Sequence, residues 1–312
     1  MNIIFNALNT NLGDTGGCLS IADSADALRT IGYGVNIAAA KNRMTWRKVS
    51  VLRDIPKCDI CIGVSTADIK STMKADAGKK AIWIRGPEWK FDVPWFPSKD
   101  KLLSLLDKFT KAGGKILCNA NWLTAWMIRH GFMAKTCYVG FDLNLFKDHG
   151  QRSADVVIGC LRSKRTSKRY KDFLKLEELL GHTDYQYCSY GHKHELHGEQ
   201  LTRFYNQCRI WFAPSVLEGF HRVPAEAALC GCLVVAVDDE RGGTADWLVD
   251  CFSGLRYKSI IEAVGMIRNV TSDEIARNSA DAMVAAAKTK LVMDIGSKES
   301  CMKKLVEAVY EN

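Results

Sequence analysis

The stretch from Ser215 to Val235 constrains the fold more than any other part of this 312-residue chain. It reads Ser-Val-Leu-Glu-Gly-Phe-His-Arg-Val-Pro-Ala-Glu-Ala-Ala-Leu-Cys-Gly-Cys-Leu-Val-Val, which predicts a loop, a short helix and an apolar strand. Pro224 suits the first turn of a helix, where its missing N–H is not needed, and Gly231 suits the position just past the helix end. We expect Glu226 to lie within that first turn.

Such a loop presents unpaired backbone N–H groups and the positive end of a helix dipole, which together favour an anion. Glu218 and Glu226 would repel phosphate oxygens, so they are expected to face hydroxyl groups of a sugar or a ribose. The pattern points to a pocket for a nucleotide sugar. The competing interpretation is an ordinary strand–helix–strand corner with two solvated carboxylates.

Short apolar strands alternate with helical patterns along the whole chain. This alternation predicts α/β architecture: two doubly wound, Rossmann-like domains with parallel sheets, facing a central cleft. The polar run at residues 147–153 is interpreted as a linker, which gives domains at 1–150 and 151–312, with the last helix able to pack back on the first domain. Ligands of such sheets bind at the carboxyl ends of the strands. The expected strands are Asn2–Leu8, Val35–Ala38, Cys58–Val64, Lys80–Ile84, Lys115–Cys118, Asp155–Gly159, Tyr185–Tyr190, Ile210–Ala213 and Leu233–Val237; the expected helices include Ser20–Ile31, Leu102–Lys111 and Trp122–His130.

Composition restricts the class of protein. No run of eighteen apolar residues occurs, and the first residues show no basic region of a signal peptide, so we expect no transmembrane helix and a cytoplasmic location. The 12 Cys are scattered through strand and helix patterns, which predicts free, mostly buried thiols in a reducing compartment. Cys58 and Cys61 have the spacing of a redox or metal pair, but their apolar strand favours plain burial.

The segment from Glu218 to Val235 resembles the E-x7-E signature of the family-4 retaining glycosyltransferases, which have the GT-B fold. The resemblance includes the flanking Gly-Phe, Glu-Ala and Gly-x-Leu-Val-Val residues. It implies transfer of a sugar from a UDP- or GDP-linked donor with retention of the anomeric configuration. It also implies that the reaction has no covalent enzyme intermediate and needs no cofactor and no obligatory metal. Tyr138 to Phe146 is similar to a hinge segment of that family.

The resemblance also implies roles for individual residues. Arg162 and Lys168 would offset the charge that develops on the leaving diphosphate, and Glu218 would contact the donor sugar. The alternative for the basic stretch around Arg162 is a solvated loop. The residues expected to bind the donor are Gly16, Gly17, Phe220, His221, Arg222, Val223 and Glu226, the last through ribose hydroxyls.

The residues expected to bind the acceptor differ from the pattern of that family. Arg85 stands where a His is expected, and an Arg cannot serve as a general base because its pKa exceeds about 12. It either clamps an anion or forms an ion pair with Glu88 or a neighbouring residue. Glu88 and Trp89 complete the expected acceptor-side residues.

Charge indicates the kind of acceptor. Residues 1–150 hold 21 Lys and Arg against 13 Asp and Glu, whereas residues 151–312 hold 22 of each. A basic domain favours an anionic partner. Residues 83–101 also interleave aromatic and basic side chains, which favours stacking on bases or sugars, insertion at a lipid surface, or packing on the domain itself.

Three functions therefore stay open. The first is transfer to a glycan or lipid-linked carbohydrate, and the second is glycosylation of a hydroxylated base in DNA. The third is an inactive GT-B binding module. Zinc binding by His192, His194 and His197 is a weak alternative for that loop, and no Asp-x-Asp motif is present, so we expect no metal site.

Overall fold

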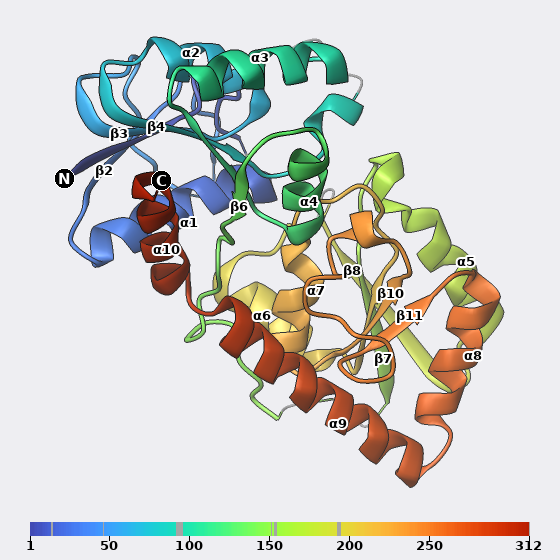
Figure 1. Ribbon diagram of the computed structural model, residues 1–312. Helices are drawn as coiled ribbons and strands as arrows, with labels where there is room; N and C mark the ends of the chain where they lie inside the picture. The colour runs from blue at the N-terminus through green and yellow to red at the C-terminus, as the bar shows by residue number, and fades with distance from the viewer. Residues whose placement is uncertain are drawn as a thin grey trace. The chain divides into compact units, whose positions relative to one another are not determined.

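The computed structural model describes residues 1–13, 15–45, 47–91, 96–150, 152, 155–191 and 195–311. The chain divides into two units, and each is built on one sheet (Figure 1). Unit 1 comprises Met1–Gly140 and Ser297–Asn312, and unit 2 comprises Phe141–Gly296.

Unit 1 contains a six-stranded sheet in the order β2-β1-β3-β4-β5-β6, and every neighbouring pair of strands is parallel. The strands are β1 (Asn2–Asn6), β2 (Gly34–Ala38), β3 (Cys58–Gly63), β4 (Ala77–Ile84), β5 (Lys115–Cys118) and β6 (Ala134–Thr136). The helices are α1 (Gly16–Thr30), α2 (Ile69–Lys74), α3 (Lys99–Lys111), α4 (Asn121–Arg129) and α10 (Lys298–Tyr310), with short 3₁₀ turns η1 (Thr66–Asp68) and η2 (Glu88–Lys90).

Local chemistry sets where α1 begins. The periodicity predicts a start at Ser20, but the helix begins at Gly16 because the Thr15 hydroxyl accepts a hydrogen bond from the Cys18 amide at 3.3 Å. This cap satisfies one of the N–H groups that a helix start leaves unpaired. It also puts Gly16 and Gly17 inside the first turn of α1, directly after the loop that follows β1.

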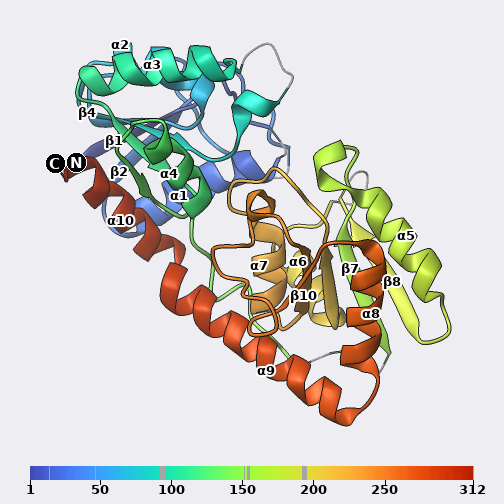
Figure 2. The ribbon, with the colours of Figure 1, turned by 45° about the vertical axis from the view of Figure 1, so that its right-hand side comes forward.

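The C-terminal helix α10 packs against α1 in unit 1, and both ribbon views show the two helices side by side (Figures 1 and 2). Leu305 and Val309 bury completely in this packing. Gly140 has φ of +75°, and a Cβ there would lie 2.6 Å from the Ser297 carbonyl oxygen. Only glycine therefore fits where the chain leaves unit 1 beside the segment that returns to it.

Unit 2 contains a five-stranded parallel sheet in the order β11-β10-β9-β7-β8. The strands are β7 (Val156–Leu161), β8 (Tyr185–Tyr190), β9 (Ile210–Ala213), β10 (Leu233–Val237) and β11 (Leu255–Tyr257). The helices are α5 (Tyr170–Leu180), α6 (Gly198–Gln207), α7 (Arg222–Leu229), α8 (Ile260–Thr271) and α9 (Glu274–Lys290), with 3₁₀ turns η3 (Thr166–Lys168) and η4 (Glu240–Gly242) and a π-helical turn η5 (Leu291–Ile295).

The central strands of unit 2 are covered on both faces, and all five residues of β10 are buried. Such continuous apolar strands are typical of parallel sheets. Phe212 of β9 stacks on Tyr257 of β11 at a centroid distance of 5.2 Å, above apolar side chains from α5, α8 and α9. Two parallel, doubly wound α/β sheets confirm the predicted fold class.

The prediction of free, mostly buried thiols is also confirmed. All 12 Cys are free, and only Cys251 is exposed. None of the helices in the described ranges has the length and apolarity that a membrane-spanning segment requires.

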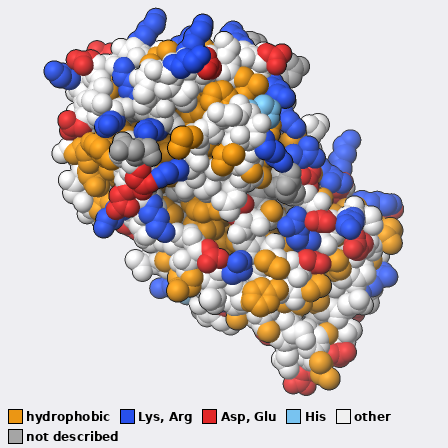
Figure 3. Space-filling view, in the orientation of Figure 1, with side chains coloured by type: hydrophobic (Ala, Val, Ile, Leu, Met, Phe, Trp, Pro, Cys, Tyr) orange, Lys and Arg blue, Asp and Glu red, His pale blue; other side chains and the backbone are white. Residues whose placement is uncertain are grey.

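The two units differ in charge. From their sequences, unit 1 carries 23 Lys and Arg against 14 Asp and Glu, and unit 2 carries 20 against 21. On the face seen in Figure 3, Lys and Arg side chains stand out over α2 and α3 of unit 1. The exposed lysines of these two helices are Lys70, Lys74, Lys99, Lys101, Lys108 and Lys111.

Candidate functional site

The carboxyl edge of the unit 2 sheet has the topology of a ligand site. β7 and β9 are neighbours, and the chain passes from β7 to β8 on one side and from β9 to β10 on the other. Loops diverge at such a switch point and leave room for a ligand above the strand ends. The loop after β7 carries Arg162 and Lys168, and the loop after β9 carries Glu218.

Lys168 and Glu218 meet at this edge. The Lys168 Nζ lies 2.7 Å from Glu218 Oε1, and the two side chains are only 16% and 17% exposed. A backbone hydrogen bond from the Val216 amide to the Ser167 carbonyl, 2.8 Å long, joins the same two loops. Two residues that lie fifty positions apart in the sequence thus form a mostly buried ion pair.

Helix α7 begins at Arg222, so Pro224 is its third residue and lies in the first turn as predicted. Glu226 is therefore the fifth helical residue, so its expected place in the first turn is wrong. Its side chain is 8% exposed and pairs with the Arg222 guanidinium at 3.0 Å. Residue 221 holds the N-cap position, but its side chain accepts no capping hydrogen bond, so the first N–H groups of α7 have no cap from that residue.

The loop after β10 closes on the loop after β9. The Glu218 amide donates to the Arg241 carbonyl at 2.6 Å, and the His221 amide donates to the Gly243 carbonyl at 3.0 Å. Gly243 has φ of +78°, and a Cβ there would lie 2.6 Å from the Gly219 carbonyl oxygen and 2.7 Å from the His221 nitrogen. The sequence did not predict that this loop contributes to the site. Its one signal is the pair Gly242-Gly243, which indicates a close approach of two backbone segments.

His221 and Phe220 are both buried in this loop. His221 is 4% exposed and Phe220 is 9% exposed, and the Phe220 ring packs on Phe141 at 5.9 Å. Burial, followed by the nearby Lys168 charge, holds the pKa of His221 well below its ordinary value. The imidazole is therefore neutral near pH 7. Val223 lies in the first turn of α7 beside them.

Arg162 follows β7 at the same carboxyl edge of the sheet. Its amide donates to the Tyr190 carbonyl at 2.7 Å, and its guanidinium lies 5.8 Å from the centre of the Tyr170 ring. The side chain is exposed. The structure therefore places Arg162 at the carboxyl edge of the sheet, and among the three expected catalytic residues, all of them described, only Lys168 and Glu218 form an ion pair.

In unit 1, Arg85 follows β4 at the carboxyl edge of the sheet. Its Nε donates to the Val64 carbonyl at 2.9 Å, and its Nη1 donates to the carbonyl of Gly17 in α1. Among the described residues, neither Glu88 nor any neighbour forms an ion pair with Arg85, so the ion-pair alternative is wrong. Arg85 instead ties the start of α1 to the ends of β3 and β4.

Glu88 is buried at the same edge. Its Oε2 accepts hydrogen bonds from both the amide and the hydroxyl of Thr66, each 2.6 Å long. Burial raises the pKa of Glu88 to about 7, against the opposing effects of these two bonds and of the Arg85 charge. Glu88 therefore titrates near neutral pH while it holds the segment after β4 to the segment after β3.

A third charged residue of this edge, Asp68, was not expected from the sequence. It is fully buried and accepts hydrogen bonds from the Asn9 amide at 2.8 Å, the Ser65 hydroxyl at 2.9 Å and the Thr10 hydroxyl. Burial raises its pKa in spite of these bonds. Asp68 thus fastens the loop after β1 to η1.

The aromatic residues of 83–101 pack largely within unit 1. Trp83 is fully buried and donates to the Cys137 carbonyl at 2.9 Å, so it cannot stack on a ligand. Trp89 stacks on Trp126 of α4 at 4.3 Å, and Trp126 stacks on His130 at 4.0 Å. Trp89 is partly exposed. Trp95 lies outside the described residues.

No group of three potential metal ligands occurs in the described part of the chain. His192 and His194 of the sequence triplet lie outside that part. His197 is described, and its Nε2 lies 3.7 Å from a Glu195 carboxylate oxygen.

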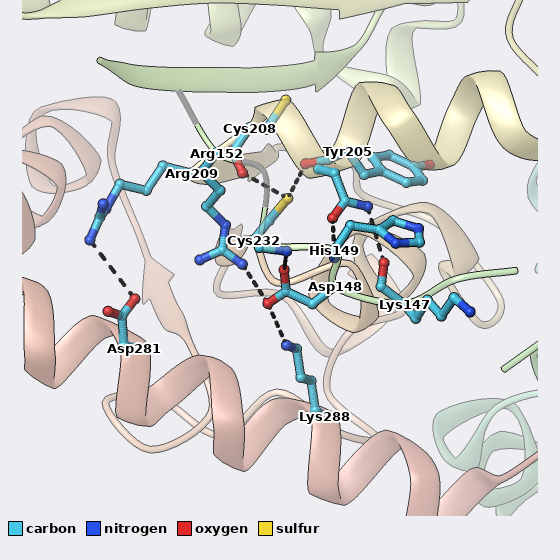
Figure 4. Close-up of polar contacts among 12 residues, drawn as sticks. Lys147, Asp148, His149, Arg152, Tyr205, Cys208, Arg209, Cys232, Asp281 and Lys288 are labelled. Atoms are coloured by element: carbon cyan, nitrogen blue, oxygen red, sulfur yellow. Dashed lines mark hydrogen bonds and ion pairs between the residues drawn. The ribbon is translucent and has the colours of Figure 1, made fainter. Parts of the chain in front are cut away.

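The amino edge of the unit 2 sheet carries a different polar network (Figure 4). The Asp148 carboxylate accepts from Lys288 of α9 at 2.7 Å and from Arg152 at 2.8 Å. The His149 amide donates to the Asn206 side chain at 2.7 Å. This run was predicted to be a linker, but its described residues are fastened to α6 and α9.

No protein-family model matches the chain, and no curated protein matches its sequence. Solved structures match it by shape. HepE from Anabaena with UDP and glucose superposes with a TM-score of 0.75 at 13% identity and covers 100% of both chains. Sucrose-phosphate synthase from Thermosynechococcus elongatus superposes with a TM-score of 0.72 at 12% identity, and the match covers 98% of both chains.

TarM from S. aureus, in a structure that contains UDP, gives a TM-score of 0.64 at 13% identity. The match covers 81% of this chain and 55% of TarM, so this chain spans about half the length of that protein. Together with the two parallel sheets, these similarities show that the chain has the GT-B fold.

Proposed function

We propose that this protein is a retaining glycosyltransferase that moves a sugar from a nucleoside-diphosphate sugar to a hydroxyl acceptor. The observation that carries the proposal is the Lys168–Glu218 pair at the switch point of the unit 2 sheet, beside the start of α7. A structure of the same fold with UDP bound, that of HepE, supports a nucleoside diphosphate as the ligand.

The donor half of the reaction follows from charge. When the bond between the anomeric carbon and the diphosphate breaks, negative charge develops on the leaving phosphate. Lys168, with Arg162 from the same loop, offsets that charge, and the amides from Phe220 to Val223 at the start of α7 add hydrogen-bond donors. Gly16 and Gly17, exposed at the start of α1, let the backbone approach the donor or the acceptor.

The carboxylates have separate roles in this proposal. Glu226 accepts from ribose hydroxyls, and Glu218 accepts from hydroxyls of the transferred sugar. Neither then needs to approach a phosphate oxygen. The reaction proceeds with retention, without a covalent intermediate and without a metal. These properties follow from the resemblance of the signature segment.

For the acceptor we propose an anionic glycan or lipid-linked carbohydrate. The net positive charge of unit 1 supports an anionic partner, and exposed lysines on α2 and α3 contribute to that charge. Trp89, partly exposed and stacked on Trp126, offers an aromatic face for a sugar ring. Arg85 and Glu88 lie at the same carboxyl edge of the unit 1 sheet.

The test starts with the donor. Thermal-shift measurements with UDP, GDP and their sugars should show stabilisation by one nucleotide series, because a ligand that binds only the folded state raises the melting temperature. Slow hydrolysis of the stabilising donor should follow, and NMR of the product reports the anomeric configuration. No stabilisation by any nucleotide and no hydrolysis would leave an inactive GT-B module as the function.

The acceptor is tested next, with anionic glycans, lipid-linked sugars and a duplex containing hydroxymethylated bases. Transfer to the duplex would favour the second candidate, glycosylation of DNA, and duplex binding should then weaken steeply with salt. Transfer to a carbohydrate alone would exclude that candidate.

A further inference from the structure

His221 is the most unusual polar residue of unit 2. It is 4% exposed, and neither Nδ1 nor Nε2 has a hydrogen-bond partner of acceptable geometry among the described residues. A backbone group of Gly242 lies close enough to the ring to raise the imidazole pKa, but no hydrogen bond of normal geometry joins the two. Buried polar atoms are nearly always paired, so an imidazole with two unpaired nitrogens requires an explanation.

The surroundings of His221 favour an anion. Lys168 lies close enough to depress the pKa of the imidazole. His221 also occupies the N-cap position of α7, where the positive end of the helix dipole adds to that charge. A neutral imidazole keeps one N–H donor, and a phosphate oxygen is the acceptor that this environment best stabilises.

A second unpaired group lies close by in the sequence. The buried Thr244 Oγ1 has no hydrogen-bond partner among the described residues, and Thr244 follows Gly243, whose carbonyl accepts from the His221 amide. Two unpaired polar side chains therefore come from the two loops that close over the ends of β9 and β10. The His221 ring and the Thr244 hydroxyl can each donate a hydrogen bond to an oxygen atom of a ligand.

The backbone of the loop is held in a costly conformation. Leu217, directly before Glu218, has φ of +64°, a region that side chains other than Gly, Asn and Asp rarely adopt. Such strain is found where the surrounding structure imposes it, often at ligand-binding loops. Because the His221 nitrogens do not reach solvent in the free protein, a ligand reaches them only if this loop shifts.

We propose that the His221 side chain binds the diphosphate of the donor, and that its nitrogens are unpaired in the free protein because their partner arrives with the ligand. This inference rests on the proposed function and adds a side-chain contact to a loop otherwise expected to act through its backbone. Binding shifts the strained loop and gives His221 a phosphate oxygen as acceptor.

His221→Phe separates this role from simple packing. The phenyl ring fills a similar volume without polar atoms, so it removes a buried unpaired group, and the variant should melt about 2–4 °C above the wild type. Its affinity for UDP should fall about 10-fold or more, since a hydrogen bond to a charged oxygen is lost. Its affinity for uridine, which lacks the diphosphate, should stay unchanged.

His221→Gln is the second variant, because its amide restores an N–H donor with a different shape. We expect it to bind UDP more tightly than His221→Phe does. Calorimetry measures the affinity for UDP, and ligand-observed NMR measures the affinity for uridine. If GDP is the nucleotide that stabilises the wild type, GDP and guanosine replace UDP and uridine.

The outcomes are distinct. Wild-type protein that binds neither UDP nor GDP overturns the proposed function and this inference together. Wild-type binding that His221→Phe retains in full overturns the inference alone. Equal losses of affinity for the nucleotide and the nucleoside, with a lower melting temperature, would also overturn it, because they indicate a packing role.

Discussion

The carboxyl edges of the two sheets use charge in different ways. In unit 1, Arg85, Glu88 and Asp68 bind backbone groups and hydroxyls of their own loops, and no two of them pair. In unit 2, Lys168 pairs with Glu218 and Arg222 pairs with Glu226. A charge that is saturated by backbone groups fixes a loop, whereas a charge in a side-chain ion pair can exchange its partner for a ligand.

The largest effect should follow from Lys168→Ala. If Lys168 offsets charge on the leaving diphosphate, its loss should lower the rate of transfer or donor hydrolysis about 100- to 1000-fold. Lys171→Ala, an exposed lysine of α5, is the matched control and should keep full activity. A wild-type rate in Lys168→Ala would mean that the unit 2 pair is structural, as the unit 1 charges are.

Asp68→Ala tests the structural side of the comparison. Removal of this carboxylate leaves the Asn9 amide and the Ser65 and Thr10 hydroxyls without their acceptor. The free energy of unfolding should fall by about 2–4 kcal/mol, as measured by urea denaturation. Asp68→Asn keeps one acceptor oxygen, so its free energy of unfolding should fall by less. Should both variants be as stable as the wild type, Asp68 does not hold the loops together.

Glu88 should make stability depend on pH. Its pKa rises from an ordinary 4.5 to about 7 in the folded protein, so the folded state favours the protonated form. The resulting stabilisation is complete below about pH 4.5 and is lost as the pH rises to about 7. Glu88→Gln keeps an acceptor for Thr66 and does not titrate.

The stability of Glu88→Gln relative to wild type should therefore increase with pH across that window, by on the order of 1–3 kcal/mol. Urea denaturation at several pH values measures this difference. A constant difference between the two proteins would show that Glu88 is not perturbed by its burial.

The smallest effect should come from Lys288→Ala at the amino edge of unit 2. Lys288 is 31% exposed, and its partner Asp148 retains Arg152. We expect a change of at most about 1 kcal/mol in the free energy of unfolding and none in UDP binding. A loss of UDP binding would show that the two edges of this sheet are not independent.

Much of the fold was predictable because parallel strands are continuous apolar runs. β9 was predicted to the residue, and so was β10. Helix starts were less predictable: the cap from Thr15 starts α1 four residues early, and α7 begins two residues before Pro224 without a side-chain cap. The predicted linker lies within unit 2, where Asp148 binds α9 and His149 binds α6, and the sequence does not reveal such distant partners.

By itself, the sequence determined two parallel α/β sheets, the loop–helix segment with Glu218 and Glu226, and the uneven charge of the two halves. These features depend on residues close together in the chain. Only the tertiary structure decided that Lys168 pairs with Glu218, that Arg85 binds carbonyls instead of Glu88, and that the ring nitrogens of His221 are buried without a hydrogen bond of normal geometry to a described residue. Those contacts join loops after different strands, and their pairing depends on the order of strands in the sheet.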